Sequence, residues 1–301
     1  MPKIEIPKAA VRCELPAEIR FLVVSSGAEP PGGPEWLHEI KHDGHRLLAV
    51  TDGRGSLTLR SRNGFDRTHL FRAPFDKLTD SRRQLVIDGE ICAPGDDGVT
   101  HIDSLNGAIS RYGKPERLAY YAFDVLYIDG HDVRRCPLAE RKELLRRVLD
   151  EAPSERIVSV DYLIDQGAEL LAGVQRIGAE GIVSKRLASI YRGGDSRDWI
   201  KTKCCEVGTF HITGFKEIGE GRLEELRVSE MHNGELRPAG SVKFGFAGKG
   251  LWETLDARRS GDGRKGVVPI QPHLVVDVRF YGRLRGWAIR DGVLLSVRPV
   301  P

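Results

Sequence analysis

Residues 39–46 read E-I-K-H-D-G-H-R, so that Lys41 ends an apolar run and is followed by an Asp-Gly turn. A neutral lysine amine can attack phosphorus, but an ordinary lysine, with a pKa of about 10.4, is almost fully protonated at pH 7. Nearby cations favour the neutral amine and can also hold a phosphate group. Lys201 and Lys203, in D-W-I-K-T-K, could supply those cations. The pattern predicts covalent nucleotidyl transfer through Lys41.

Composition restricts the class of protein. The chain has 301 residues, 40% hydrophobic and 30% charged, which suits a folded protein with room for two domains. It shows no signal-peptide core and no run of eighteen apolar residues, so we expect a cytoplasmic protein without a membrane segment. The cysteines are odd in number and scattered, which favours reduced thiols over disulfides or a zinc site.

The net charge of +3 is unevenly distributed. Residues 205–301 hold 15 Lys and Arg against 12 Asp and Glu, whereas residues 1–204 hold 31 of each. The surplus is densest between residues 258 and 298. It fits a surface that binds a polyanion, and it equally fits a solvated basic face. The basic residues of this stretch are Arg258, Arg259, Arg264, Lys265, Arg279, Arg283, Arg285, Arg290 and Arg298, against Asp262, Asp277 and Asp291.

The elements that must position these residues point to an α+β fold. Strand-like runs lie at 36–41, 46–51 and 57–60, the last two joined by a Gly-rich hairpin turn. Two further runs, 84–91 and 119–128, are expected to close at Asp-Gly turns. An apolar stripe after Pro137 and the segment 168–177 before Gly178 predict helices. The sheets should be mixed or antiparallel.

Beyond Cys205 the chain changes to short strands with regular turns and one helix near 251–258. This pattern is typical of a five-stranded barrel of the OB-fold type. We therefore predict an irregular lead-in over residues 1–21, a sheet domain over 22–204 and a barrel over 205–301.

Four ordered motifs accompany the octapeptide: S-R-N-G at 61–64, D-G-E-I at 88–91, Y-Y-A-F-D-V-L-Y at 120–127 and E-G-I-V-S-K-R at 180–186. With W-I-K-T-K at 199–203 they resemble the ATP-dependent DNA ligases of the covalent nucleotidyltransferase superfamily. The likeness is greatest to the ligase module of bacterial end-joining ligases. It implies an adenylation domain followed by an OB-fold domain, and it extends from about Trp36 to the C-terminus.

The resemblance assigns roles to residues. It implies that Lys41 becomes adenylated by ATP, that Arg46 contacts the nucleotide sugar or the nick, and that Arg62 clasps phosphate, a task that suits a guanidinium. Glu39 belongs to the same nucleotide site. Lys201 and Lys203 would hold phosphate.

Other roles concern the base, the metal and the nucleic acid. Strand alternation places Tyr121, Phe123 and Val125 on one face, opposite Ala122, Asp124 and Leu126. By resemblance Phe123 stacks on adenine, while Glu180 and Glu90 lie at a divalent metal, Mg2+ or Mn2+, which phosphoryl transfer needs. The residues expected to contact nucleic acid are Arg62, Arg283, Arg285 and Arg290.

One departure from the family pattern stands near the C-terminus, where Gly292 follows Arg290-Asp291 in place of an expected lysine. That lysine orients pyrophosphate in the family, so a slow first step is expected unless Lys201, Lys203 or Arg285 compensates. The prediction is a monomeric ligase of nicked or broken duplex DNA, helped by an end-binding repair protein. Alternatives are an RNA ligase, a capping-type enzyme or an inert nucleic-acid-binding homologue.

Overall fold

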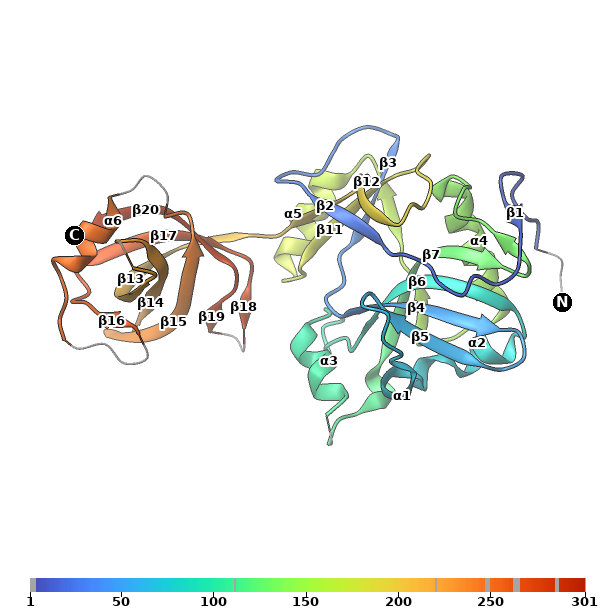
Figure 1. The fold of residues 1–301 in the computed structure, drawn as a ribbon, viewed down its shortest axis with the longest axis horizontal. Coiled ribbons are helices and arrows are strands. Elements are labelled where there is room, and N and C mark those ends of the chain that lie inside the picture. The colour runs from blue at the N-terminus through green and yellow to red at the C-terminus, as the bar shows by residue number, and fades with distance from the viewer. Residues whose placement is uncertain are drawn as a thin grey trace. The chain divides into compact units, whose positions relative to one another are not determined.

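The computed structural model describes residues 4–110, 112–219, 221–246, 250–261, 266–284 and 287–300. The chain divides into two compact units, residues 1–203 and 204–301 (Figure 1). Each unit has hydrophobic clusters of its own. In the described ranges no helix combines the length and apolar character that crossing a membrane requires.

The first unit contains two mixed sheets, which confirms the α+β class. One has the strand order β1-β8-β7-β6-β4-β5, with β9 beside β7, and the other has the order β10-β3-β11-β12-β2. The β7–β9 and β12–β2 pairs are parallel and the remaining pairs are antiparallel. The strands are β1 Val11–Arg12, β2 Leu22–Ser26, β3 Trp36–Ile40, β4 His45–Asp52, β5 Leu57–Ser61, β6 Gln84–Cys92, β7 Ala119–Ile128, β8 His131–Asp132, β9 Ile157–Ser159, β10 Tyr162–Ile164, β11 Gly181–Arg186 and β12 Gly194–Lys203.

Short helices connect the strands, and the longest covers the first sheet. The helix α4 begins directly after Pro137, as the sequence predicts, and its apolar stripe packs into the core under β6 and β7. The predicted helix before Gly178 is also present as α5. The helical segments of this unit are α1 Thr68–Phe71, η1 Ala73–Phe75, α2 Asp76–Asp80, α3 Ile102–Ala108, η2 Pro115–Arg117, α4 Leu138–Glu151 and α5 Gly167–Arg176.

The predicted turn at Asp88-Gly89 is wrong, because both residues lie inside β6. Gly89 is needed there for close packing. A Cβ at this position would lie 2.5 Å from Tyr120 Cζ, and the Tyr120 hydroxyl lies 2.9 Å from both the Leu47 and Ile87 carbonyl oxygens. The other predicted Asp-Gly turn, at Asp129, is correct and follows β7.

The predicted alternation along β7 is also wrong. The register of β7 against β6 shifts twice, between Ala122 and Asp124 and again between Val125 and Tyr127. Each shift inserts an extra residue, which reverses the facing of those that follow. Val125 therefore packs into the core with Ala122, whereas Phe123 packs in the other cluster with Leu126.

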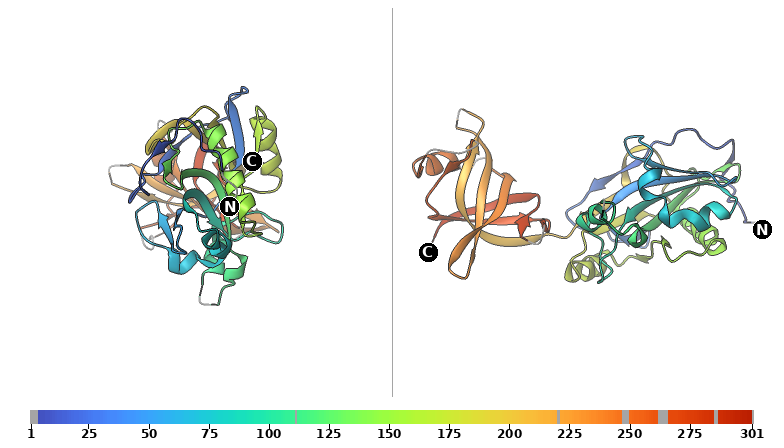
Figure 2. Two further views of the ribbon diagram at one scale, coloured as in Figure 1. Left: turned by 90° about the vertical axis from the view of Figure 1, so that its right-hand side faces the viewer. Right: turned by 90° about the horizontal axis from the view of Figure 1, so that it is seen from below.

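The second unit is a sheet that closes on itself. Its strands pair in the order β14-β15-β20-β17-β13-β16, and β13 also pairs with β14. Figure 2 shows these strands curling around one core. The β14–β15 hairpin turns at Asn233-Gly234, both with positive φ, as an Asn-Gly turn favours. The elements are β13 Glu206–Glu217, β14 Leu223–His232, β15 Glu235–Phe244, α6 Leu251–Asp256, β16 Val268–Pro269, β17 Leu274–Phe280, β18 Arg283–Leu284, β19 Ala288–Ile289 and β20 Gly292–Pro299.

Candidate active site

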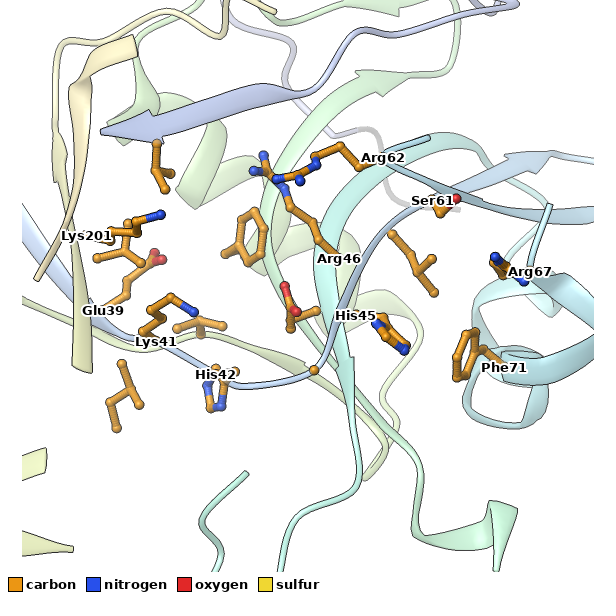
Figure 3. A pocket seen from close by; sticks show the side chains of 18 of the residues that line it. Glu39, Lys41, His42, His45, Arg46, Ser61, Arg62, Arg67, Phe71 and Lys201 are labelled. Atoms are coloured by element: carbon orange, nitrogen blue, oxygen red, sulfur yellow. The ribbon is translucent and has the colours of Figure 1, made fainter. Parts of the chain in front are cut away.

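A pocket of about 690 Å³ opens in the first unit where the two sheets approach each other. Its lining comes from both sheets and from the segment that follows β5. Figure 3 shows Lys41, Lys201 and Arg62 directed into it. The predicted site residues that line it are Glu39, Lys41, Arg46, Arg62, Glu90, Phe123 and Lys201.

Lys41 lies directly after β3, and both its backbone N–H and its side-chain ammonium form hydrogen bonds. Its backbone N–H donates to the Gly181 carbonyl over 2.9 Å, and its ammonium donates to Glu180 Oε2. The other oxygen of Glu180 lies 3.2 Å from Lys203 Nζ. Burial raises the pKa of Glu180, but Lys41 and Lys203 outweigh burial and leave that pKa below its ordinary value. Glu180 and Lys203 thus join the site through Lys41.

Lys201 lies on β12 opposite Val183 and projects into the pocket. Burial lowers the pKa of Lys201, and repulsion from Lys203 and Lys41 lowers it further. Cations this close to one another favour an anion between them. The end of the pocket nearest Lys41 is therefore suited to a polyphosphate.

The loop between β3 and β4 fixes the direction of Lys41. The Asp43 N–H donates to Thr100 Oγ1 over 3.0 Å, and Asp43 Oδ2 accepts the Ile102 N–H over 3.1 Å. Gly44 is required for close approach, because a Cβ there would overlap the Ile91 carbonyl oxygen. The loop is therefore fastened to β6 and to the start of α3.

Arg46 is held inside the protein rather than free in the pocket. Its Nε and Nη2 donate to the two oxygens of Asp88 over 2.9 and 2.7 Å, and its Nη1 donates to the Leu22 carbonyl over 2.7 Å. Tyr191 donates its hydroxyl to Asp88 Oδ2 over 2.7 Å. Burial disfavours the charge of Arg46, but Asp88 outweighs burial and raises the pKa of the guanidinium. Arg46 presents a fixed cation at the edge of the pocket.

Glu90 is the carboxylate that reaches the pocket wall from β6. Burial raises its pKa to about 8, Asp88 and Glu180 add to the rise, and Lys41 and Arg46 oppose it. A cation between Glu90 and Glu180 would offset the free-energy cost of burying their negative charges. Carboxylate oxygens suit Mg2+, which is often bound by one or two carboxylates together with phosphate oxygens. The described residues contain no cluster of three or more His, Cys, Asp or Glu arranged to hold a metal. Glu90 and Glu180 offer only two carboxylates, so a magnesium ion held by them would need further ligands from a nucleotide or water.

Two aromatic rings, Phe123 and Trp199, form part of the pocket wall. Phe123 and Trp199 meet edge to face with ring centroids 6.1 Å apart. Lys185 Nζ lies 4.3 Å from the Phe123 centroid and 3.9 Å from that of Trp199. Its pKa falls to about 8 because burial and Lys142 outweigh the attraction of Glu39. A planar base could stack here.

The sequence reasoning missed several residues of the site. Lys185 lies in E-G-I-V-S-K-R and alternates with Val183, so strand periodicity could have found it. Lys142 carries a weaker signal, a charged residue four positions after Leu138 on the apolar face of α4. His42 lines the pocket and stacks on Tyr121 at 3.8 Å, and burial lowers its pKa to about 4. No motif indicated Tyr191.

The predicted basic surplus of the second unit is partly neutralised. Arg283 forms a two-point contact with Glu230, at 3.0 and 3.1 Å, and Arg259 reaches Glu217 at 3.3 Å. Arg290 Nε lies 3.8 Å from Asp291. Glutamates from outside the stretch therefore neutralise part of its local excess of positive charge. Arg285 lies outside the described residues.

Gly292, where the family pattern has a lysine, begins β20 inside the barrel. A Cβ at this position would lie 3.1 Å from Ile289 Cδ1, 3.2 Å from Val278 Cγ1 and 3.3 Å from Val242 Cγ2. The position is apolar and tight. Any side chain at this position requires its neighbours in the core to move by a few tenths of an ångström.

The chain is similar to known DNA ligases. Residues 23–203 match the model of the ATP dependent DNA ligase domain. The chain is 30% identical to the multifunctional non-homologous end joining protein LigD of Pseudomonas aeruginosa over 319 residues, covering 97% of this chain but only 36% of that protein. The crystal structure of the ligase domain of M. tuberculosis LigD superposes with a TM-score of 0.58 at 26% identity, over 93% of this chain and 95% of that one.

A second solved structure, mycobacterial DNA ligase D complexed with ATP and MES, matches with a TM-score of 0.57 at 25% identity, again over 93% of this chain and 95% of that one. The family model covers more than half of the residues, and it ends where the first unit ends. The chain belongs to the ATP-dependent DNA ligase family.

Proposed function

We propose that this chain is an ATP-dependent DNA ligase that seals breaks bearing a 3′-hydroxyl and a 5′-phosphate through a lysyl-AMP intermediate on Lys41. The observation that carries the proposal is that one pocket is lined by Lys41, by the cationic side chains of Lys201 and Arg62, and by the rings of Phe123 and Trp199. Such a pocket complements the phosphates and the base of one nucleotide. Membership of the ligase family supports the same conclusion.

The reaction comprises three displacements at phosphorus. The neutral amine of Lys41 bonds to the α-phosphorus of ATP, and the bond to pyrophosphate breaks. A DNA 5′-phosphate oxygen then takes AMP from the lysine. A 3′-hydroxyl finally attacks that 5′-phosphate, seals the backbone and releases AMP. Because all three steps place negative charge in one region, one set of cations serves each of them.

The remaining site residues receive the roles that their positions support. Lys201, Lys203 and Arg62 would bind phosphate, and Phe123 would stack on the adenine while Glu39 lies beside it. Arg46 would contact the sugar or the nick. Glu90 and Glu180 would hold Mg2+, or Mn2+ in its place, which neutralises charge on the phosphates.

The second unit would be an OB-fold that follows an adenylation domain at 22–204. Its five mutually paired strands and the single helix between β15 and β17 support this assignment. Its basic residues, Arg283 and Arg290 among them, would contact duplex DNA, although Arg283 must first exchange Glu230 for phosphate. End joining in the cytoplasm by a monomer, with an end-binding repair protein, is the setting that the LigD likeness suggests.

The test is transfer of label from ATP radiolabelled at its α-phosphate. Wild-type protein with Mg2+ should carry the label and Lys41→Ala should not. Lys77→Ala removes an exposed lysine of α2 and should label normally. Equal labelling of wild type and Lys41→Ala would overturn the assignment.

The same assay separates the other members of the superfamily. Sealing of nicked DNA in preference to nicked RNA, with ATP in preference to GTP, is expected. An RNA ligase or a capping-type enzyme would reverse one of these preferences. An inert homologue would give neither adduct nor sealed strand.

A further inference from the structure

Lys142 contacts residues of the pocket wall, Phe123 among them, and its side chain is 3% exposed. Its ammonium is 2.5 Å from Glu39 Oε1, 3.1 Å from the Val160 carbonyl oxygen and 3.4 Å from that of Phe123. A lysine ammonium has three N–H donors and no acceptor, so these contacts use all of them. Glu39, Val160 and Phe123 each line the pocket. One ammonium on α4 thus joins three separate segments of the pocket wall.

Glu39 is held as an ionised acceptor. Its second oxygen lies 2.5 Å from Lys185 Nζ, which itself lies against the Phe123 ring. Burial raises the pKa of Glu39, but Lys142 and Lys185 outweigh burial and lower that pKa below its ordinary value. An ionised carboxylate only accepts hydrogen bonds, and each of its oxygens can accept more than one. Glu39 therefore offers acceptor capacity, and no donor, beside the aromatic rings.

A group that accepts hydrogen bonds but donates none can distinguish adenine from guanine. Adenine carries an exocyclic amine, a donor, where guanine carries a carbonyl oxygen, an acceptor. We propose that Lys142 is a positioning residue for base selection, which fixes Glu39 as the acceptor for the exocyclic amine of an adenine stacked on Phe123. The inference rests on the proposed function, because it requires ATP to be the nucleotide donor.

Removal of the ammonium should affect only nucleotides that carry the amine. Lys142→Met keeps the length of the side chain but leaves Glu39 with Lys185 alone, so the carboxylate is free to turn toward Lys185. ATP then loses a hydrogen bond to a charged group. Purine riboside triphosphate, which lacks the exocyclic amine, has no such bond to lose.

The experiment measures formation of the nucleotidyl-protein adduct by intact mass spectrometry over a range of nucleotide concentrations. We expect Lys142→Met to raise the half-saturating concentration of ATP about tenfold, with little change in the rate at saturation. The half-saturating concentration of purine riboside triphosphate should stay unchanged. Lys77→Met, at an exposed position of α2, should leave both values as in the wild type.

Equal weakening of both nucleotides would show that Lys142 only supports the fold, and unchanged ATP binding would also overturn the proposal. If Lys142→Met does not fold, Glu39→Gln provides the same comparison. Its amide can donate as well as accept, so the preference for ATP over inosine triphosphate should fall about tenfold. A preserved preference would overturn the proposal. A wild-type protein that forms no adduct with any nucleotide would instead contradict the proposed function.

Discussion

The guanidinium of Arg46 shows how a single side chain is held ready in this site. Asp88 and the Leu22 carbonyl occupy its donors, and the Tyr191 hydroxyl completes the arrangement. Tyr191 also accepts the Leu22 N–H over 3.1 Å. Because every partner is protein, Arg46 keeps its place without a bound nucleotide. The proposed contact of Arg46 with the nucleotide sugar or the nick would therefore need little additional ordering of this side chain.

We predict that Tyr191→Phe lowers the free energy of unfolding by about 1–3 kcal/mol, because it leaves the buried Leu22 N–H without this acceptor and removes a donor to Asp88. Urea unfolding measures the change. Tyr112→Phe, at a side chain that is 88% exposed, is the control and should change stability by less than about 0.5 kcal/mol. A loss at Tyr191 no larger than the loss at Tyr112 would contradict the assigned network.

Individual site residues could be predicted from the sequence where they belong to one of its motifs. Lys41, Glu90 and Phe123 all reach the pocket, as their motifs indicate. Tyr191 and Lys142 were not predictable, because each acts through a partner about a hundred positions away, Asp88 and Glu39 respectively. Such pairs depend on which strands become neighbours, and local periodicity does not contain that information.

At the scale of elements, the loop after β3 depends on the absence of a side chain at Gly44. The loop passes so close to β6 that a methyl group there would meet the Ile91 carbonyl. The direction of Lys41 toward the pocket is thereby coupled to the position of β6, which also carries Glu90. The proposed nucleophile, Lys41, and the proposed metal ligand, Glu90, are thus linked through the close packing at Gly44.

We expect Gly44→Ala to reduce the rate of Lys41 adenylation about a hundredfold, because displacing a reacting group by roughly an ångström has an effect of that order. The rate of label transfer from ATP measures it. Gly173→Ala is the matched control, since nothing lies within 4 Å of the added methyl group and the residue is in α5. The proposed coupling would be refuted by Gly44→Ala protein that labels as fast as the control.

The presence of the strands could be predicted from apolar runs, but the irregularities within the strands could not. The shifts in β7 and the continuation of β6 through Asp88-Gly89 arise from the fit between neighbouring strands around Tyr120. Turn-forming residues inside a strand look the same in sequence as those that end one. For this reason Val125 was assigned to the wrong face while Phe123 was placed correctly in the pocket.

In the barrel, Asp277 joins β13, β17 and β20. It accepts hydrogen bonds from Thr209 Oγ1 over 2.6 Å and from Ser296 Oγ over 2.7 Å, and it pairs with Arg298. The hydrogen bonds from Thr209, Ser296 and Arg298 lower the pKa of Asp277 from 3.8 to about 2. A pKa lowered by folding means that the ionised form stabilises the barrel above pH 4 and that this stabilisation is lost as the pH falls toward 2.

The expected result is that Asp277→Asn melts at a lower temperature than the wild type at pH 6, and that the difference narrows between pH 4 and pH 2. Thermal unfolding followed by circular dichroism at each pH provides the measurement. Asp291→Asn, at a residue whose side chain is 55% exposed, is a suitable comparison. A difference between wild type and Asp277→Asn that does not vary with pH would exclude ionisation of Asp277 as its source.

At the scale of the whole molecule, the cores are separate. The clusters of the first unit and the cluster of the second share no residue, and the pocket is lined entirely by residues 24–201. The sequence indicated this division, because the chain changes to short strands with regular turns beyond Cys205. The sequence could not indicate which acidic residues neutralise the basic stretch, because Glu217 and Glu230 come from distant strands.

We therefore predict that residues 1–203 and 204–301 each fold when expressed alone. Each fragment should unfold cooperatively at a temperature close to one of two transitions of the full chain. Scanning calorimetry of the three proteins measures this. A fragment that lacks any cooperative transition would show that its core needs the other unit.

The packing around Gly292 also limits which side chains this position can accept. A lysine at position 292 would begin its side chain against Ile289, Val278 and Val242, and would bring a charged group into an apolar part of the barrel. Such a substitution would damage the barrel before it could benefit catalysis. A cation that handles pyrophosphate is therefore easier to accommodate on an accessible loop than at position 292.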